Sequence, residues 1–349
     1  MKEQAKYRQL ADELREQIMG GTYAVGDTLP TEQELQETHL LSRQTVRQAI
    51  AILERDGLVY RRRGSGTYIG RMPRRQTAHL TVGVITTYIT DYIFPSIIRG
   101  IENSLSQNNC TMNLVATGSR LDTERDILRN LLEHPVDGLI VEGTKSALPN
   151  PNIKLYEELQ KQNVPMVFIN NYYPQLQNAV HVVMDDYDGG RQITECLIRE
   201  GHTHIAGIFK SDDMQGHERF RGYADAIAQA GLPLRDEDVA WFSTDNKQAF
   251  LQGALRYPDF SGVTALVCYN DEIATAARQY LAQHSAGSAV TLFSFDNSIY
   301  SRLSLPPLRS LGHPKEQLGV TAATKLLRMI AGQHEDSEVM KWEFPSNTQ

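Results

Sequence analysis

The sequence predicts an α/β protein in two parts: a small head of helices that ends in a β-hairpin, and a larger domain of two α/β lobes. Two observations predict this division. Helical spacing of apolar residues dominates the start of the chain, whereas from Leu80 onward short apolar strands alternate with amphipathic segments of about 10–17 residues. Residues 71–79 have almost no apolar content. We therefore expect a head over residues 1–70, a linker over residues 71–79 and the larger domain over residues 80–349.

The chain of 349 residues has the composition of a soluble globular protein, with 41% hydrophobic and 22% charged residues. No apolar run approaches the roughly 18–20 residues that span a bilayer. The polar N-terminus lacks the apolar segment of a secretory signal. Cys110, Cys196 and Cys268 lie far apart without metal-binding spacing, and we interpret them as buried free thiols in a reducing compartment. These features favour a cytoplasmic protein that needs neither metal nor cofactor.

Three helices are predicted in the head. Residues 7–18 carry apolar side chains at helical spacing. The run Thr31-Glu32-Gln33-Glu34 is a capping box for a short second helix. Ser42 caps a third helix, which Asp56-Gly57 ends. The apolar face of this third helix is formed by Val46, Ala49, Ile50 and Leu53.

Two short strands, residues 58–60 and 67–69, follow the third helix and are joined by the glycine-containing turn 61–66. Three helices and a β-hairpin make a winged helix-turn-helix. The charge supports this interpretation, since the whole chain carries −7 but residues 1–79, with 13 basic and 10 acidic residues, carry +3. Residues 42–75 hold nine arginines against only Glu54 and Asp56. A basic block on an acidic chain indicates a DNA-contacting region.

The candidate DNA-binding residues lie on the third helix and in the turn. Arg43 and Arg47 are one helical turn apart on the face opposite the apolar residues, with Gln44 beside them. Arginine bonds bidentately to guanine and glutamine to adenine, which is what a major-groove reader needs. An isolated arginine is more often solvated surface, but here helix order, cap and basic turn agree. The expected contacts in the turn are Arg61, Arg63, Gly64 and Gly66, where glycine lets the backbone approach DNA closely.

The head resembles the winged-helix domain of the GntR family. The resemblance covers residues 5–70 and is carried by Lys6-Tyr7 and by residues 26–35 (GDTLPTEQEL), 42–47 (SRQTVR), 57–58 (GL) and 64–68 (GSGTY). It implies that the protein binds operator DNA as a homodimer. The family's DNA contacts fall at positions that match Lys6, Glu32, Arg43, Arg47 and Arg63.

The larger domain is predicted to hold parallel sheets with helices on both faces. The candidate strands are residues 80–85, 111–115, 138–142, 165–169, 180–183, 204–209, 264–268 and 290–295. Ligands of open α/β sheets bind at the carboxyl ends of the strands. Polar or aromatic side chains follow several of these strands, namely Tyr88, Asp91, Phe94, Glu142, Lys145, Arg219, Asn270 and Asp296. Together they suit a small sugar, with hydrogen bonds to hydroxyls and an aromatic platform. A polar residue at a strand end also commonly caps a helix, and for Asn270 that alternative has equal weight.

This domain resembles the effector domain of the LacI/GalR family, which is related to periplasmic sugar-binding proteins. The resemblance runs from about residue 80 to 331 and is carried by residues 81–84, 94–102, 136–140, 201–205, 269–271 and 294–296, and by Arg219 with Gly222-Tyr223. It implies a periplasmic-binding-protein-like fold of two lobes. Its ligand contacts would be Asp91, Phe94, Lys145, Arg219, Asn270, Asp296 and His313.

The combination of the two parts is more specific. A GntR-type head on a LacI/GalR-type body, with residues 86–94 and 142–147, is similar to repressors of arabinose utilisation, which implies L-arabinose as the effector. Two features depart from the LacI/GalR pattern. The hinge helix of that family is absent, so its minor-groove mechanism does not transfer. The C-terminal run Lys341-Trp342-Glu343-Phe344-Pro345 differs from the family ending, which leaves the pairing of the last strand open.

The sequence argues against three other functions. His202 and His204 have no third ligand nearby and are a weak metal site. Asp185 and Asp186 are adjacent and point in opposite directions, and no GxGxxG, P-loop, GxSxG or HExxH motif occurs, which argues against an enzyme. A sugar transport protein would need a signal peptide and would lack the basic head. We therefore predict a DNA-binding repressor of sugar-utilisation genes that the sugar releases from its operator.

Overall fold

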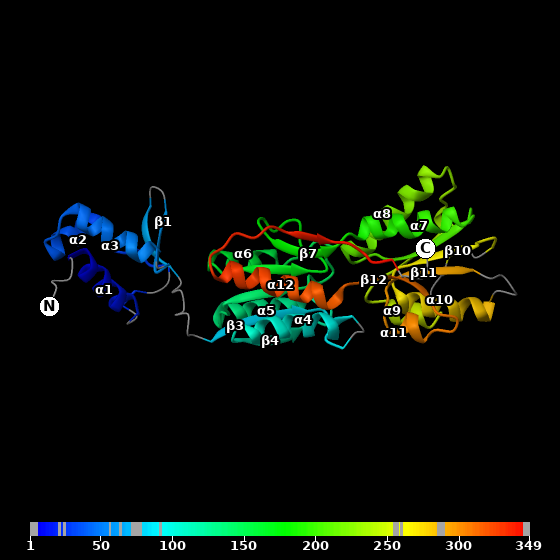
Figure 1. Ribbon diagram of the computed structural model, residues 1–349, viewed down its shortest axis with the longest axis horizontal. Helices are drawn as coiled ribbons and strands as arrows, with labels where there is room; N and C mark the ends of the chain where they lie inside the picture. Colours follow the sequence, from blue (N-terminus) through cyan, green and yellow to red (C-terminus); the bar gives the residue numbers. More distant parts are fainter. Residues whose placement is uncertain are drawn as a thin grey trace. The chain divides into compact units, whose positions relative to one another are not determined.

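The computed structural model describes residues 6–19, 22–23, 26–55, 57–62, 65–70, 79–90, 93–253, 258, 261–284 and 290–344. The chain divides into two compact units, Met1–Ala78 and His79–Gln349 (Figure 1). The second unit thus begins at the last residue of the expected linker. Among the described residues, none of the helices is both long and apolar enough to cross a bilayer.

The first unit is a winged helix-turn-helix with helices α1 (Lys6–Met19), α2 (Glu32–His39) and α3 (Arg43–Arg55). Its core is built from the apolar faces of these helices, and Leu14, Val46 and Leu53 are almost fully buried in it. The capping box is present, because Thr31 accepts a hydrogen bond from the Glu34 amide and Glu34 accepts one from the Thr31 amide. The sequence therefore located the start of the second helix correctly.

The wing is the antiparallel pair β1 (Val59–Arg62) and β2 (Gly66–Ile69). Arg61 pairs with Thr67 and Arg62 pairs with Gly66. The strands therefore include residues that were expected to form the turn 61–66. Stacking of Tyr60 on Tyr68, with ring centroids 5.7 Å apart, favours this longer pairing. Arg61 and Gly66 therefore belong to strands, and Arg63 and Gly64 lie outside the described residues.

Lobe 1 of the second unit is a parallel sheet in the order β13-β7-β6-β5-β3-β4. Its strands are β3 (Leu80–Thr86), β4 (Cys110–Ala116), β5 (Gly138–Val141), β6 (Met166–Ile169), β7 (Val180–Met184) and β13 (Glu338–Met340). Successive strand residues face opposite sides, so Val84 packs with helices α4 (Phe94–Gln107) and α12 (Lys315–Ile330), whereas Ile85 packs with α5 (Leu121–Glu133) and α6 (Ile153–Lys161).

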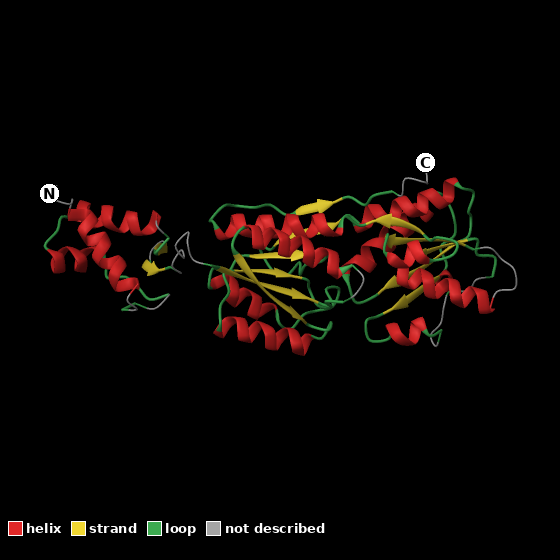
Figure 2. Ribbon diagram, turned by 60° about the horizontal axis from the view of Figure 1, so that its bottom comes forward, coloured by secondary structure: helices red, strands yellow, loops and turns green. Residues whose placement is uncertain are grey.

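Lobe 2 is a second parallel sheet in the order β12-β11-β10-β8-β9. Its strands are β8 (Ile205–Lys210), β9 (Val239–Phe242), β10 (Ala265–Cys268), β11 (Thr291–Asp296) and β12 (Arg309–Gly312). Helices α7 (Asp186–Arg199) and α8 (Met214–Gln229) cover one face, and α9 (Lys247–Leu251) and α10 (Asp271–His284) cover the other. The short elements η1 (Asp236–Asp238) and α11 (Ile299–Leu303) complete the lobe. Figure 2 shows helices flanking the strands in both lobes.

The chain crosses between the lobes three times. It leaves lobe 1 between β7 and α7, returns between β12 and α12, and crosses again after β13, where Glu343 forms a β-bridge with Gly312. The open question of the last strand is thereby answered, because β13 pairs in parallel with β7 directly before the unusual C-terminal run begins at Lys341. These crossings hold the carboxyl ends of both sheets toward each other, which is where the candidate ligand residues were expected.

Candidate functional site

A cavity of about 90 Å³ lies between the two lobes. Seven of the expected ligand residues line it: Tyr88, Phe94, Glu142, Lys145, Arg219, Asn270 and Asp296. The expected residue Asp91 lies outside the described residues, and His313 is not part of the lining. Since the lining comes from both lobes, a ligand in this cavity would touch both at once.

Glu142, at the end of β5, forms part of the lobe 1 wall. One carboxylate oxygen accepts hydrogen bonds from the Thr87 amide at 2.8 Å and hydroxyl at 2.5 Å, and the other accepts one from the Asn170 amide group at 3.0 Å. Burial raises the pKa of Glu142, and these hydrogen bonds oppose the shift. The carboxylate is therefore fixed in place before any ligand arrives.

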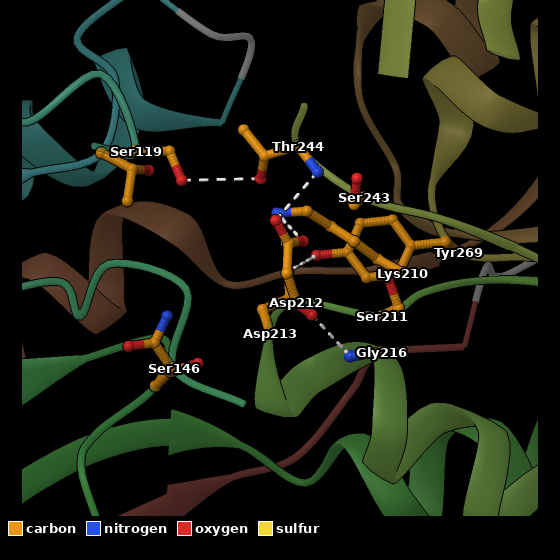
Figure 3. Close-up of polar contacts among 12 residues, drawn as sticks. Ser119, Ser146, Lys210, Ser211, Asp212, Asp213, Gly216, Ser243, Thr244 and Tyr269 are labelled. Carbon is orange, nitrogen blue, oxygen red and sulfur yellow. Dashed lines mark hydrogen bonds and ion pairs between the residues drawn. The ribbon is translucent and has the colours of Figure 1, made fainter. Parts of the chain in front are cut away.

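Lys145 lies at the edge of the cavity, on the loop after β5. Its backbone has a left-handed φ of 46°, and its ammonium group binds both carboxylate oxygens of Asp245 in lobe 2, at 2.7 and 2.9 Å. Ser119 and Thr244 approach each other across the same gap, with hydroxyl oxygens 3.5 Å apart (Figure 3). The two lobes therefore contact each other directly beside the cavity.

Arg219, on α8, has only 2% of its surface exposed and forms the floor in lobe 2. Its Nε donates to Asp186 at 2.8 Å, and its guanidinium carbon lies 4.3–5.0 Å from the rings of Tyr269, Phe295 and Trp342. Burial raises the pKa of Asp186 to about 7, against the opposing effect of Arg219. An arginine held between three rings and a carboxylate is rigid, as recognition of a small ligand requires.

Close backbone packing fixes the helix that carries Arg219. A Cβ atom on Gly190 of α7 would lie 2.2 Å from the Arg219 carbonyl oxygen, and one on Gly222 would lie 2.0 Å from the Tyr187 carbonyl oxygen. Only glycine fits at such contacts. The neighbouring Arg221 points elsewhere, since its side chain is exposed and pairs with Glu218. The sequence pair Arg219/Arg221 therefore contributes one cavity residue.

Lys210 and Asp213 line the cavity and were missed by the sequence interpretation. The Lys210 ammonium lies 3.0 Å from an oxygen of Asp213, which also accepts a hydrogen bond from the Tyr269 hydroxyl at 2.6 Å (Figure 3). The other oxygen of Asp213 caps α8 at the Gly216 amide. Glu142 and Asn270 were identified because polar side chains at the carboxyl ends of strands are expected to meet the ligand. Lys210 is the last residue of β8, so the same expectation applies to it.

Asn270 and Asp296 end neighbouring strands of lobe 2. The Asn270 side-chain oxygen accepts a hydrogen bond from the Ile273 amide, so the capping alternative is correct, although Asn270 also lines the cavity. Asp296 has φ of 97°, and its carbonyl oxygen accepts a hydrogen bond from the Lys315 ammonium. This rare conformation places a buried carboxylate at the cavity wall.

His313 lies behind the lining instead of in it. Its ring packs edge-on against Trp342, at 5.3 Å between centroids, and neither ring nitrogen has a hydrogen-bond partner among the described residues. Burial, with the charges of Lys315 and Arg219, lowers its pKa far below the usual range, so the ring is neutral. The ring of Trp342, from the C-terminal segment, lies directly beside His313.

In the head, Glu32 lies between the two arginines expected to read DNA. Its oxygens are 3.4 Å from Nε of Arg43 and 3.3 Å from Nε of Arg47, and both arginine side chains are more than half exposed. Gln44 and Lys6 are also exposed. Arg43, Gln44 and Arg47 line one shallow groove on α3, while Arg61 and Gly66 line another beside the wing. The candidate contacts therefore occupy accessible surface around α3 and the wing.

The other candidates from the sequence have structural roles. Asp185 caps α7 and pairs with Lys341, away from Asp186, so the two carboxylates do not share a site. His202 contacts Thr264, and His204 contacts Asp238. No group of three or more metal-ligating side chains occurs in the described part of the chain.

Two family models match the chain. Residues 79–346 match periplasmic binding proteins and the sugar-binding domain of the LacI family, and residues 6–69 match bacterial regulatory proteins of the gntR family. The fold and cavity thus define a sugar-binding regulatory domain joined to a DNA-binding head. The chain belongs to the LacI-type family of sugar-binding domains, with a gntR-type head, and it is a transcriptional regulator and not an enzyme.

Two curated relatives match almost the whole chain, and both are named arabinose metabolism transcriptional repressor. The protein of Geobacillus stearothermophilus is 38% identical over 93% of this chain and 91% of its own length. The protein of Halalkalibacterium halodurans is 34% identical over 95% of this chain and 91% of its own length. Among solved structures, the transcription regulator CcpA of Lactococcus lactis covers 77% of this chain and 98% of its own, at 24% identity and a TM-score of 0.66, which shows the shared fold.

Proposed function

We propose that this protein represses genes of L-arabinose utilisation by binding operator DNA, and that L-arabinose bound between the lobes releases it. The cavity carries this proposal, because it joins the cation of Arg219 to the polar groups of Asn270 and Asp296 and to the aromatic ring of Phe94. Charged and amide groups bind vicinal hydroxyls, and an aromatic face packs on the C–H side of a sugar ring. The curated relatives, by their names, act in arabinose metabolism.

The proposed DNA readers are the exposed residues of the head. Arg43, Gln44 and Arg47 would enter the major groove from α3, and Lys6 and Arg61 would contact phosphates. Glu32 would hold both arginines in the orientation that the bases require, since its carboxylate lies between them. Binding to operator DNA also implies that the protein works in the cytoplasm.

We propose that the working form is a homodimer assembled through the region around α11. Exposed apolar side chains gather there, with Ile299 55%, Leu303 73% and Leu305 88% exposed. Exposed apolar patches on a globular protein mark interaction surfaces. Analytical ultracentrifugation of the wild type and of Leu303→Asp tests this assignment: we expect a dimer and a monomer, and a dimeric variant would contradict it.

The effector assignment is tested by titration calorimetry of the full chain with L-arabinose, D-ribose, D-xylose and D-glucose. We expect saturable binding of L-arabinose and at least about tenfold weaker binding of the others, because hydroxyls in the wrong orientation leave buried polar groups unpaired. A sugar other than L-arabinose as the tightest ligand would overturn the identity of the effector. Binding of none of them would overturn the proposed function.

A further inference from the structure

Glu124 is a fully buried carboxylate on α5, away from the cavity lining. It accepts hydrogen bonds from the hydroxyls of Tyr156 and Tyr173, at 2.9 and 2.7 Å, and from the amide groups of Asn150 and Asn152, both at 2.8 Å. Among the described residues, its side-chain contacts are these tyrosine and asparagine groups, and none of them is a lysine, arginine or histidine. These four donors fill the hydrogen-bonding capacity of the two carboxyl oxygens, so the buried group is fully satisfied without an ion pair.

Tyr173 joins this buried carboxylate to the loop of residues 143–146. Its hydroxyl donates to Glu124 and accepts a hydrogen bond from the Thr144 amide at 2.6 Å. Burial, together with the charge of Glu124, raises the pKa of Tyr173 well above its usual range, so the hydroxyl keeps its proton. The adjacent amide of Gly143 donates to the side chain of Asn171 at 2.8 Å. Two successive backbone amides of the loop therefore donate hydrogen bonds to side chains of the segment that follows β6.

The same loop forms the lobe 1 side of the cavity and of the contact with lobe 2. Gly143 and Lys145 line the cavity. Lys145 binds Asp245 of lobe 2, and the Ser146 hydroxyl accepts a hydrogen bond from the Met214 amide of lobe 2 at 3.1 Å. The left-handed backbone of Lys145 is unfavourable for a non-glycine residue, so surrounding contacts must hold it.

We propose that Glu124 and Tyr173 are positioning residues, which fix this loop so that Lys145 and Ser146 meet lobe 2 when the effector is bound. Neither residue lines the cavity, and both act through the backbone of Thr144. The inference rests on the proposed function, since it names residues that support the effector site. It assigns part of the support of that site to Glu124 of α5, which does not line the cavity.

Tyr173→Phe and Tyr156→Phe are a matched pair. Each removes one hydroxyl that donates to Glu124, both rings are buried, and it is Tyr173 whose hydroxyl accepts a hydrogen bond from the loop. We expect Tyr173→Phe to weaken L-arabinose binding about tenfold, because it leaves the buried Thr144 amide without an acceptor, and Tyr156→Phe to change it less than about twofold. Thermal unfolding without sugar measures the stability loss that both variants share. Equal changes in affinity for the two variants would overturn the proposal.

Hydrogen exchange followed by mass spectrometry tests the loop without relying on sugar binding. In the ligand-free wild type we expect the peptide that spans residues 142–147 to be protected, and in Tyr173→Phe, but not Tyr156→Phe, to exchange at least about tenfold faster. Rapid exchange of this peptide in the wild type would overturn the proposal even if Tyr173→Phe does not fold. If the wild type binds no sugar, the proposed function fails, and the exchange result still decides the role of Tyr173.

Discussion

Nε of Arg219 donates a 2.8 Å hydrogen bond to Asp186, and both side chains are buried beneath the cavity between the lobes. Removing one partner of a buried hydrogen-bonded pair leaves the polar group of the other without a partner. The pair therefore makes the effector site dependent on a residue of α7 that the ligand need not touch.

Arg219→Ala should abolish the increase in melting temperature that L-arabinose causes, while operator binding without sugar persists. The guanidinium forms the cavity floor, and the head folds around a core of its own. Arg221→Ala is the matched control, because Arg221 lies on the same helix with an exposed side chain. An unchanged calorimetric affinity for L-arabinose in Arg219→Ala would show that this residue is not a ligand contact.

Asp186 should make the protein less stable as the pH rises from about 4 to 7. Its pKa is raised by burial to about 7, from an ordinary value near 4, so the folded state binds a proton in this range that the unfolded state has lost. The stabilisation is complete below pH 4 and is lost as the pH rises through 7. We expect the free energy of unfolding of the wild type, minus that of Asp186→Asn, to fall across this range in urea titrations. A difference that grows with pH would mean that Arg219 holds Asp186 ionised.

Trp342 should report effector binding by fluorescence. Its ring lies 5.0 Å from the Arg219 guanidinium carbon, whereas the second tryptophan, Trp241, lies on β9 with 38% of its surface exposed. We expect L-arabinose to change the emission of Trp241→Phe, which retains Trp342, and to leave that of Trp342→Phe unchanged. The opposite pattern would show that the ligand does not affect the floor of the cavity.

Arg43 and Arg47 should supply base-specific contacts. Replacing either with alanine should cost about 1–3 kcal/mol of operator binding and reduce the preference for operator over scrambled DNA. Glu32→Gln should reduce the same preference, because it weakens the interaction that holds both arginines. Fluorescence anisotropy with both duplexes measures this preference. Equal losses on operator and scrambled DNA would assign Arg43 and Arg47 to phosphate contacts.

The sequence predicted most of the fold because the buried strands are continuous apolar runs. All eight strands predicted for the larger domain occur within about two residues of their expected bounds. The strands that it missed are short, and two of them carry polar residues, as in β12 with Arg309 and Ser310. No apolar run marks such a strand, and only the neighbouring β11 defines its place in the sheet.

The candidate site was predictable where polar residues directly follow strands, as for Glu142 and Asn270. It was not predictable where long-range packing decides, as for His313, which Trp342 covers from a segment that pairs with β12 only in the folded protein. Glu124 illustrates the same limit. Within a helix it has the pattern of a surface residue, and only the folded chain brings Tyr156, Tyr173 and two asparagines around it.

Release of the repressor by a sugar requires that sugar binding and DNA binding be coupled. In a dimer, closure of the lobes around a sugar would move the points from which residues 71–79 lead to the heads, and DNA half-sites have a fixed separation. A fully flexible linker would absorb that movement, so coupling requires that the linker transmits it. Linkage then requires that operator DNA weakens sugar binding by the same factor by which sugar weakens DNA binding.

The most direct test measures operator affinity with and without saturating L-arabinose, for the intact protein and for residues 1–79 alone. The operator is a duplex selected by the intact protein from a random-sequence library. We expect L-arabinose to weaken binding of the intact protein about 5–150-fold and to leave the isolated head unaffected. An operator affinity of the intact protein that does not change with L-arabinose would contradict the proposed function, because the sugar would then not release the repressor.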